Sequence, residues 1–465
     1  SYLVANAVII PITGWLAHYF SRKRLLLTVV AGFTFTSMLC GLATSLPALI
    51  FFRVLQGITG AGLQPLSQAV LLEEFPPEQR GQAMAFWSLG IVAAPILGPT
   101  LGGWLTDTYS WRWVFFISLP VGVVSFIMIL LFLHDPPYIQ RGNMRADFIG
   151  LGMLAVGMGA LQIMLDKGQQ EDWFGSRFIV GLAITAAVML PAFVIRELLV
   201  PEPMVRIRLF KRASFASGAF LVTIMGFVLY GSLVLLPLFM QTLLGWTAVT
   251  AGIWTSPRGI GTALCMPLVG YLLGRKWDGR WMVAFGFCVA GLAFFGYSHM
   301  SLQSGTWDIF WCQVQQGIGM AFITVPLTTL TMEAISKEET GYATSLYSAM
   351  RNVGSSLGIS FVTTWLARRS QAHQTVLVAH ATPYSLRTQQ FLRQAGALFA
   401  RQGADGATAS RRSLAVLYGT VRKQSAVLSF IDVFRIMGVL FLGVIPLVLL
   451  MRKAKTDAEP PHASH

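Results

Sequence analysis

The stretch LIFFRVLQGITGAGLQPLSQAVLL, residues 49–72, is apolar and long enough to cross a lipid bilayer as a helix. Such a crossing needs roughly 20 mostly apolar residues. Its one charged residue is Arg53, and no acidic residue lies within reach on the same helix face. An arginine inside a bilayer costs on the order of 2.5–3.5 kcal/mol. The stretch therefore predicts a membrane-embedded cation that the rest of the chain has to balance.

The composition supports a membrane protein throughout. Of 465 residues, 54% are hydrophobic and 12% charged, with a mean hydropathy of +0.62. Soluble domains carry about 25% charged residues, so an ordinary cytosolic enzyme is excluded. The net charge of +14 comes mostly from short segments between apolar runs, which is typical of topology signals and not of nucleic-acid binding. The four cysteines lie in apolar runs and lack metal-ligand spacing.

Thirteen segments are predicted to span the membrane: 2–20, 24–45, 47–72, 82–106, 111–133, 147–166, 177–199, 214–241, 248–273, 280–300, 306–335, 341–366 and 429–451. Between these spans, short loops rich in basic residues alternate with loops nearly free of them, which assigns the basic loops to the cytoplasm. They include the sets at 22–24, 141–145, 196–212, 275–280 and 452–455. With this orientation the first span runs inward, so we expect a further helix before Ser1 and fourteen in all.

These spans predict a domain organisation with one long outer segment. The parts are an N-terminal half at 1–134, two linker helices at 147–200, five helices at 213–366, a long periplasmic loop at 367–427, a last transmembrane helix at 428–452 and a cytoplasmic tail at 453–465. Within the loop, 388–403 and 410–430 have amphipathic helical patterns. The loop is either a solvated cap or a docking surface for a periplasmic partner, and both interpretations stay open.

An internal repeat relates the two halves. PITGWLAHYFSRKR from Pro11 and PLVGYLLGRKWDGR from Pro267 share a proline, a glycine three residues later and a final basic cluster, at an offset of 256 residues. At an offset of 260, three glycines also match in one register: Gly57 with Gly317, Gly81 with Gly341, and Gly98 with Gly358. Duplicated helical halves are typical of alternating-access transporters with a central site. Channels also contain repeats, so the pattern alone is not decisive.

Several of these motifs resemble those of the major facilitator superfamily. GWLAHYFSRKR is similar to its loop motif, FFRVLQGITGAG to its fourth-helix arginine motif, and LGIVAAPILGPTLGGWLTD to the fifth-helix motif of drug:proton antiporters. SWRWVFFISLPVG and LQIMLDKGQQEDWF resemble the fourteen-span EmrB-type multidrug exporters in particular. Two positions differ from the loop motif: His18 stands where the family often has an acid, and Ser21 where it often has glycine.

The resemblance implies an all-α integral membrane fold with two six-helix halves and two intervening helices, the first helix being absent from this chain. It implies proton-coupled multidrug efflux by alternating access across the bacterial inner membrane, driven by the proton gradient without a cofactor. The implied partners are lipophilic drugs, protons, membrane lipid, an EmrA-type periplasmic adaptor and a TolC-type outer-membrane channel. Export or import of a single metabolite is the alternative. Since the chain lacks HExxH and P-loop motifs, we do not expect an enzyme.

The resemblance also assigns roles to individual residues. Arg53 and Gln56 would serve proton coupling, and an acid on the helix before Ser1 would pair with Arg53. The conformational motifs would comprise Gly14, Arg22, Arg24, Gly98, Pro99, Gly102 and Gly103. Physically, Gly90, Ala94, Gly98 and Gly102 recur every four residues and give one helix face that a neighbouring helix can approach closely. This face serves either plain packing or a hinge.

Two further arginines are predicted near the middle of the membrane. Arg258 and Arg351 each lie about 15 Å from the nearer end of their spans at 1.5 Å per residue. They either tether helices through hydrogen bonds or face a wet central cavity. We predict a cationic substrate cavity, suited to anionic or neutral lipophilic drugs, formed by Arg258, Arg351, Asn352, Tyr230 and Met240. Asp166 is expected at an outer helix end, and no metal site is expected.

Overall fold

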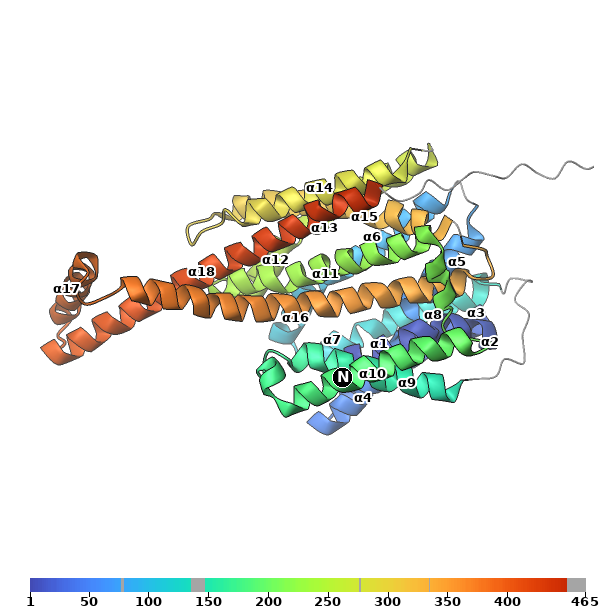
Figure 1. Ribbon diagram of the computed structural model, residues 1–465, viewed down its shortest axis with the longest axis horizontal. Helices are drawn as coiled ribbons and strands as arrows, with labels where there is room; N and C mark the ends of the chain where they lie inside the picture. The colour runs from blue at the N-terminus through green and yellow to red at the C-terminus, as the bar shows by residue number, and fades with distance from the viewer. Residues whose placement is uncertain (77–78, 135–146, 276, 334, 450–465) are drawn as a thin grey trace, which may run out of the picture.

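The fold is a long bundle of helices from which one lobe projects (Figure 1). It is seen in a computed structural model that describes residues 1–76, 79–134, 147–275, 277–333 and 335–449. All regular secondary structure among these residues is helical. The tail at 453–465 and the basic residues Arg141 and Arg145 lie outside the described residues.

The N-terminal half contains the predicted spans, several of them interrupted. Its elements are α1 (Tyr2–Ile9), η1 (Ile10–Ile12), α2 (Thr13–Phe20), α3 (Arg22–Leu42), α4 (Leu46–Gly60), α5 (Leu63–Glu74), α6 (Arg80–Thr108), α7 (Trp113–Phe116) and α8 (Ser118–Phe132). The first span tightens to a 3-10 turn around Pro11, which has no amide hydrogen for the α-helical bond. The opening stretch also divides, between Gly60 and Leu63.

Two linker helices follow and pair with each other. They are α9 (Phe148–Lys167) and α10 (Arg177–Leu199), with η2 (Trp173–Gly175) between them and η3 (Ile207–Lys211) after them. Asp147 caps α9 and accepts two hydrogen bonds of 2.7 Å from Arg196. These bonds hold the pKa of Asp147 below its ordinary value. The charged pair therefore fastens the inner ends of α9 and α10 together.

The linker pair lies on the boundary between the two halves. α9 packs on α1 of the N-terminal half and on α16 of the C-terminal half. On the α16 side, the hydroxyl of Ser356 donates a buried hydrogen bond of 2.8 Å to Gln162. At the outer end, Trp173 donates one of 3.1 Å to Thr364. The two extra helices therefore bridge the halves along one side.

The C-terminal half repeats the arrangement with two much longer helices. It comprises α11 (Ala213–Thr242), α12 (Ala248–Thr255), α13 (Pro257–Gly274), α14 (Gly279–Tyr297), α15 (Thr306–Glu333), α16 (Thr340–His380), α17 (Leu386–Arg401) and α18 (Gly406–Leu449). The ninth predicted span breaks at Ser256, just before Pro257. The expected boundaries at 366 and 428 fall inside α16 and α18, which continue without interruption beyond the membrane span.

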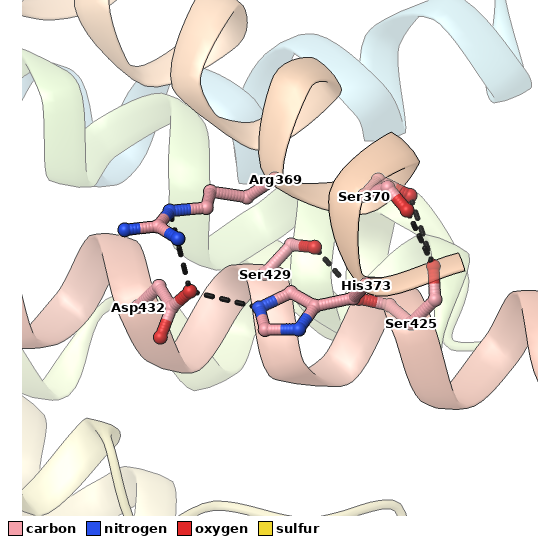
Figure 2. A network of polar contacts seen from close by, with 6 residues as sticks. All are labelled: Arg369, Ser370, His373, Ser425, Ser429 and Asp432. Atoms are coloured by element: carbon pink, nitrogen blue, oxygen red, sulfur yellow. Dashed lines mark hydrogen bonds and ion pairs between the residues drawn. The ribbon is translucent and has the colours of Figure 1, made fainter. Parts of the chain in front are cut away.

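The segment 367–427, the outer lobe, is consequently helical along most of its length. It comprises the outer parts of α16 and α18 together with α17, which packs on α18. Figure 2 shows the polar contacts where α16 and α18 leave the bundle. His373 and the carboxylate of Asp432 are hydrogen-bonded at 2.8 Å, and Arg369 lies 3.5 Å from the same oxygen. Ser425 donates to the carbonyl of Ser370 at 2.8 Å, so the lobe has a fastened base.

The predicted spans differ in hydropathy, and the least apolar of them lie at contacts between the halves. Within the described residues, nine helical segments are long and apolar enough to cross a membrane. The predicted spans at 82–106, 248–273, 306–335 and 341–366 are helical but do not meet these limits. These spans form contacts between the halves, since α6 packs on α13 and α15, and α16 packs on α2 and α5. Their lower hydropathy fits a location that is shielded from lipid.

The internal repeat is confirmed in three dimensions. A Cβ atom on Gly57 would lie 2.5 Å from the carbonyl oxygen of Tyr2, and one on Gly317 would lie 2.0 Å from that of Arg258. Tyr2 and Arg258 are themselves 256 residues apart, the offset of the proline motifs. α1 and α4 in one half, and α13 and α15 in the other, therefore approach each other at equivalent glycines, as small-residue packing in membranes requires.

Candidate functional site: polar networks in and between the halves

Arg53 takes part in a polar network within the N-terminal half. Its Nη1 donates to Oε1 of Gln56 at 3.3 Å, and its guanidinium lies 4.4 Å from the ring centre of Phe115. Gln56 donates to Ser37 at 3.1 Å, and Ser118 donates to the same hydroxyl at 2.7 Å. The network joins α3, α4 and α8. Hydrogen bonds and a cation–π contact therefore hold the Arg53 guanidinium in place, and its charge has no carboxylate partner among the described residues.

An equivalent network lies in the C-terminal half. Tyr297 donates to Gln316 at 3.2 Å and is the counterpart of Ser37, just as Gln316 is the counterpart of Gln56, both at an offset of 260 residues. Gln316 in turn donates to Ser232 of α11 at 3.1 Å. The repeat thus preserves a hydrogen bond that joins α3 to α4 in one half and α14 to α15 in the other.

Arg258 belongs to this second network. Its Nη1 donates to Ser232 at 3.3 Å, and the side chain is only 3% exposed. Of the two interpretations of Arg258, helix-tethering hydrogen bonds describe its position in this structure. Its assignment to the substrate cavity stays a prediction. The depth of Arg258 along its span correctly predicted that the side chain is buried. It could not predict which residues the side chain contacts.

Arg351 lies between the two halves. Its Nη2 donates to Oε1 of Gln64 on α5 at 2.6 Å, and its guanidinium lies 6.0 Å from the ring centre of Trp87 on α6. Trp87 itself donates to Ser67 at 2.9 Å. The Arg351–Gln64 bond therefore links α16 of the C-terminal half to α5 of the N-terminal half.

The other residues predicted for the cavity occupy two helices. Asn352, next to Arg351 on α16, is half-buried, as is Tyr230 on α11. Met240 is fully buried in the hydrophobic core near the outer end of α11. The structure thus brings Arg351 to the boundary between the halves and places Met240 within helix packing. The roles of all three in binding stay predictions.

The loop motif lies where the halves meet at the end that we assign to the cytoplasm. A Cβ on Gly14 would lie 2.6 Å from the carbonyl oxygen of Gly341, so α2 and α16 touch backbone to backbone. The repeat gives the equivalent contact between Gly270 and Gly81, where a Cβ on Gly270 would lie 3.4 Å from the carbonyl oxygen. Two related glycine contacts therefore close this end of the molecule.

Charged and aromatic residues surround the first of these contacts. Arg22 is buried and forms an ion pair with Glu73 at the end of α5, whereas Arg24 is exposed. The ring of His18 lies 5.0 Å from that of Tyr342 on α16. An aromatic contact to the C-terminal half therefore occupies the position where the family often has an acid.

The small face of α6 differs from its counterpart on α16. In α16, a Cβ on Gly354 or Gly358 would lie 2.1 or 2.0 Å from backbone oxygens of α11. In α6, Gly98 has no described atom within 4 Å of its Cβ position, and Gly102 and Gly103 meet only Val114 and Val249 at 4.0 and 3.5 Å. Pro99 lies within the same continuous helix. The equivalent of the α11 contact is thus open on α6 in the described residues.

The remaining predicted residue is Asp166, which is exposed near the outer end of α9 as expected. A search of the described residues finds no group of three His, Cys, Asp or Glu side chains arranged to hold a metal ion. Most of the polar partners were not predicted from the sequence, namely Ser37, Gln64, Ser232, Tyr297 and Gln316. The offset of 260 residues could have indicated Gln316 and Tyr297 as counterparts of Gln56 and Ser37.

Two related helical halves that cross a membrane and share buried polar networks define a class of protein, the transporter with a central boundary between repeats. A family model of the Major Facilitator Superfamily matches residues 1–359. The chain belongs to the major facilitator superfamily, and it is a multi-pass membrane protein.

Comparison with known proteins finds close relatives. The fatty acid resistance protein FarB of Neisseria gonorrhoeae is 37% identical over 100% of this chain and 88% of its own length. The multidrug export protein EmrB is 41% identical in Haemophilus influenzae (85% and 77% covered) and 35% in Escherichia coli K12 (96% and 86% covered). The structure of the human organic anion transporter MFSD10 aligns with a TM-score of 0.59 at 13% identity, covering 95% of this chain and 82% of that one, which supports the fold alone.

Proposed function

We propose that the protein exports multiple lipophilic drugs across the inner membrane of a bacterium by alternating access. The observation that carries the proposal is the pair of repeat-related glycine contacts, Gly14 with Gly341 and Gly270 with Gly81, which close one end between two similar halves. Rocking of the halves about a central site would open this end and close the other. The EmrB relatives are named multidrug export proteins, which supports drugs as the exported compounds.

Proton influx drives this export in the proposal, and no cofactor takes part. Arg53 and Gln56 would carry the coupling, since their network connects three helices of one half around a cation that no described carboxylate neutralises. The Arg53 cation would stabilise the ionised form of a proton-carrying acid beside it and would thereby lower the proton affinity of that acid. Such a pair can convert protonation into helix movement.

Inverted membrane vesicles test the export activity and its energy source. Vesicles containing the protein should accumulate several chemically unrelated lipophilic drugs when a proton gradient is imposed, and accumulation should stop when a protonophore collapses the gradient. Vesicles without the protein are the control. Accumulation of one compound only would favour the alternative of a single-metabolite transporter, and accumulation that is indifferent to the gradient would contradict proton coupling.

The outer lobe would dock a periplasmic adaptor, which in turn would reach an outer-membrane channel. The lobe is strongly basic, with nine basic residues against the single acid Asp405: Arg368, Arg369, Arg387, Arg393, Arg401, Arg411, Arg412, Arg422 and Lys423. Large apolar side chains are also exposed on it, beyond the membrane span, including Tyr384, Leu386, Leu398, Leu414 and Tyr418. Exposed apolar groups among charges of one sign are typical of a surface for an acidic partner.

Charge reversal on the lobe should weaken docking without affecting transport. In the variant Arg411→Glu with Arg412→Glu, we expect association with the adaptor to slow by about tenfold, because both arginines are exposed and steer an acidic partner. Surface plasmon resonance with the adaptor measures this, and drug uptake by inverted vesicles should match the wild type. The variant Arg177→Glu, at the outer end of α10, is the matched control. Equal association rates for both variants would contradict the docking proposal.

A further inference from the structure

A buried cation at the boundary between the halves has no acidic partner in the part of the chain that the structure describes. Arg351 is 6% exposed, and no described carboxylate lies within ion-pair distance of it. Its hydrogen-bond acceptor is the neutral side chain of Gln64 at 2.6 Å. A buried charge is costly unless an opposite charge compensates it. The environment of Arg351 is therefore suited to receive an anion.

Further buried polar groups with unused hydrogen-bonding capacity lie one helical turn away. Gln68 follows Gln64 by one turn on α5 and is 0% exposed, and neither its Nε2 nor its Oε1 has a partner among the described residues. Ser348 precedes Arg351 by one turn on α16, is 1% exposed, and its hydroxyl is likewise unpartnered there. Because α5 and α16 pack together and run in opposite directions, both residues lie on the cytoplasmic side of the Arg351–Gln64 bond.

The donors of this cluster match an anionic group. The guanidinium of Arg351, the amide of Gln68 and the hydroxyl of Ser348 all carry N–H or O–H donors that a carboxylate accepts. We propose that Arg351, Gln64, Gln68 and Ser348 form a binding site for the anionic group of a lipophilic acid, with the apolar part of that substrate lying between the halves. The site rests on the proposed export function and specifies one substrate class for it.

The site would also couple binding to movement. Gln64 belongs to the N-terminal half and Arg351 to the C-terminal half, so their hydrogen bond holds the two halves together in this structure. A bound carboxylate offers Arg351 a stronger, charge-assisted acceptor and displaces Gln64. Binding of the acid therefore weakens a link between the halves at the place where they separate. A neutral analogue of the same shape does not displace Gln64 in this way.

A pair of substrates that differ only in charge tests the site. Inverted vesicles are supplied externally with 1-pyrenebutyric acid or with its primary amide, and the uptake kinetics of wild type and Arg351→Gln are compared. We expect the variant to raise KM for the acid by at least tenfold and to leave KM for the amide within twofold. Arg351→Lys should retain part of the acid transport, because it keeps the charge. Arg177→Gln, an exposed arginine on α10, is the control for a lost surface charge.

A second variant keeps the test decisive if Arg351→Gln fails to fold. Gln68→Leu removes donors without removing a charge, and we expect it to raise KM for the acid by threefold or more with no change for the amide. Parallel losses for acid and amide would show a structural role and overturn the proposal, as would unchanged KM values for both. If the wild type transports neither compound nor any other drug, the export function itself fails. Transport of neutral drugs with no preference for the acid contradicts only the anion site.

Discussion

Gly14→Ala is expected to reduce drug export to below a tenth of the wild-type rate. The added methyl group would lie 2.6 Å from the carbonyl oxygen of Gly341 and 2.7 Å from the Cα of Tyr342, so α2 and α16 must move apart. Overpacking of this kind costs about 1–3 kcal/mol. Because the contact exists only while this end is closed, the cost falls on the closed state and shifts the population toward the open one.

Two measurements distinguish this effect from misfolding. Drug uptake by inverted vesicles gives the rate, and labelling of a cysteine at Ser345 by a membrane-impermeant reagent from the cytoplasmic side reports opening, because Ser345 is buried beside the contact. Gly159→Ala is the matched control, since its Cβ would meet only Val4 at an ordinary 3.9 Å. Wild-type export and unchanged labelling in Gly14→Ala would show that the halves do not close through this contact.

Arg53→Ala is expected to abolish drug accumulation against a gradient while leaving downhill exchange of drug intact. The substitution removes the cation of the N-terminal network, which bonds Gln56 at 3.3 Å and lies over Phe115 at 4.4 Å. Loss of a hydrogen bond to a charged group costs about 1.5–3 kcal/mol. Without the cation, the proton-carrying acid proposed beside Arg53 would also bind its proton more tightly. Drug-induced proton release from energised vesicles should therefore disappear.

Two companion variants define the role of the charge in this network. Arg53→Lys keeps the cation and should retain part of the coupled transport, whereas Gln56→Leu keeps Arg53 but breaks its connection to Ser37. If Arg53→Ala still releases protons on addition of drug, the arginine only positions helices and coupling runs elsewhere. The C-terminal counterpart of Arg53 is the neutral Gln313, and the charge of the C-terminal network is instead that of Arg258, which donates to Ser232.

The sequence predicted the positions of the helices well, because a bilayer demands apolar segments of a set length. It did not predict that α16 reaches His380 or that α18 begins at Gly406. Outside the membrane a helix needs no apolar run, so a hydropathy window stops at the lipid boundary although the helix continues. The break at Ser256 was not predicted either, although Pro257 directly after it lacks the amide hydrogen that an unbroken helix uses.

The site was predicted only at the level of single residues. Arginines within apolar spans stand out because charge is rare there, and Arg53, Arg258 and Arg351 were recognised in this way. Their partners are neutral glutamines and serines that carry no signal by themselves. The bond from Arg351 to Gln64 joins residues 287 positions apart and on different halves. Only the packing of α16 on α5 brings these two side chains together, and no spacing within either helix encodes it.

The linker helices have a mechanical consequence. α9 is hydrogen-bonded to α16 through Gln162 and Ser356, whereas against α1 it places Gly159 beside Val4, and no side-chain hydrogen bond joins α9 to α1 among the described residues. When the halves rock, the hydrogen bond between α9 and α16 resists relative movement, whereas the apolar contact between α9 and α1 permits it. We therefore expect α9 to move with the C-terminal half and to slide along α1. Lipid would then stay excluded from this seam throughout the cycle.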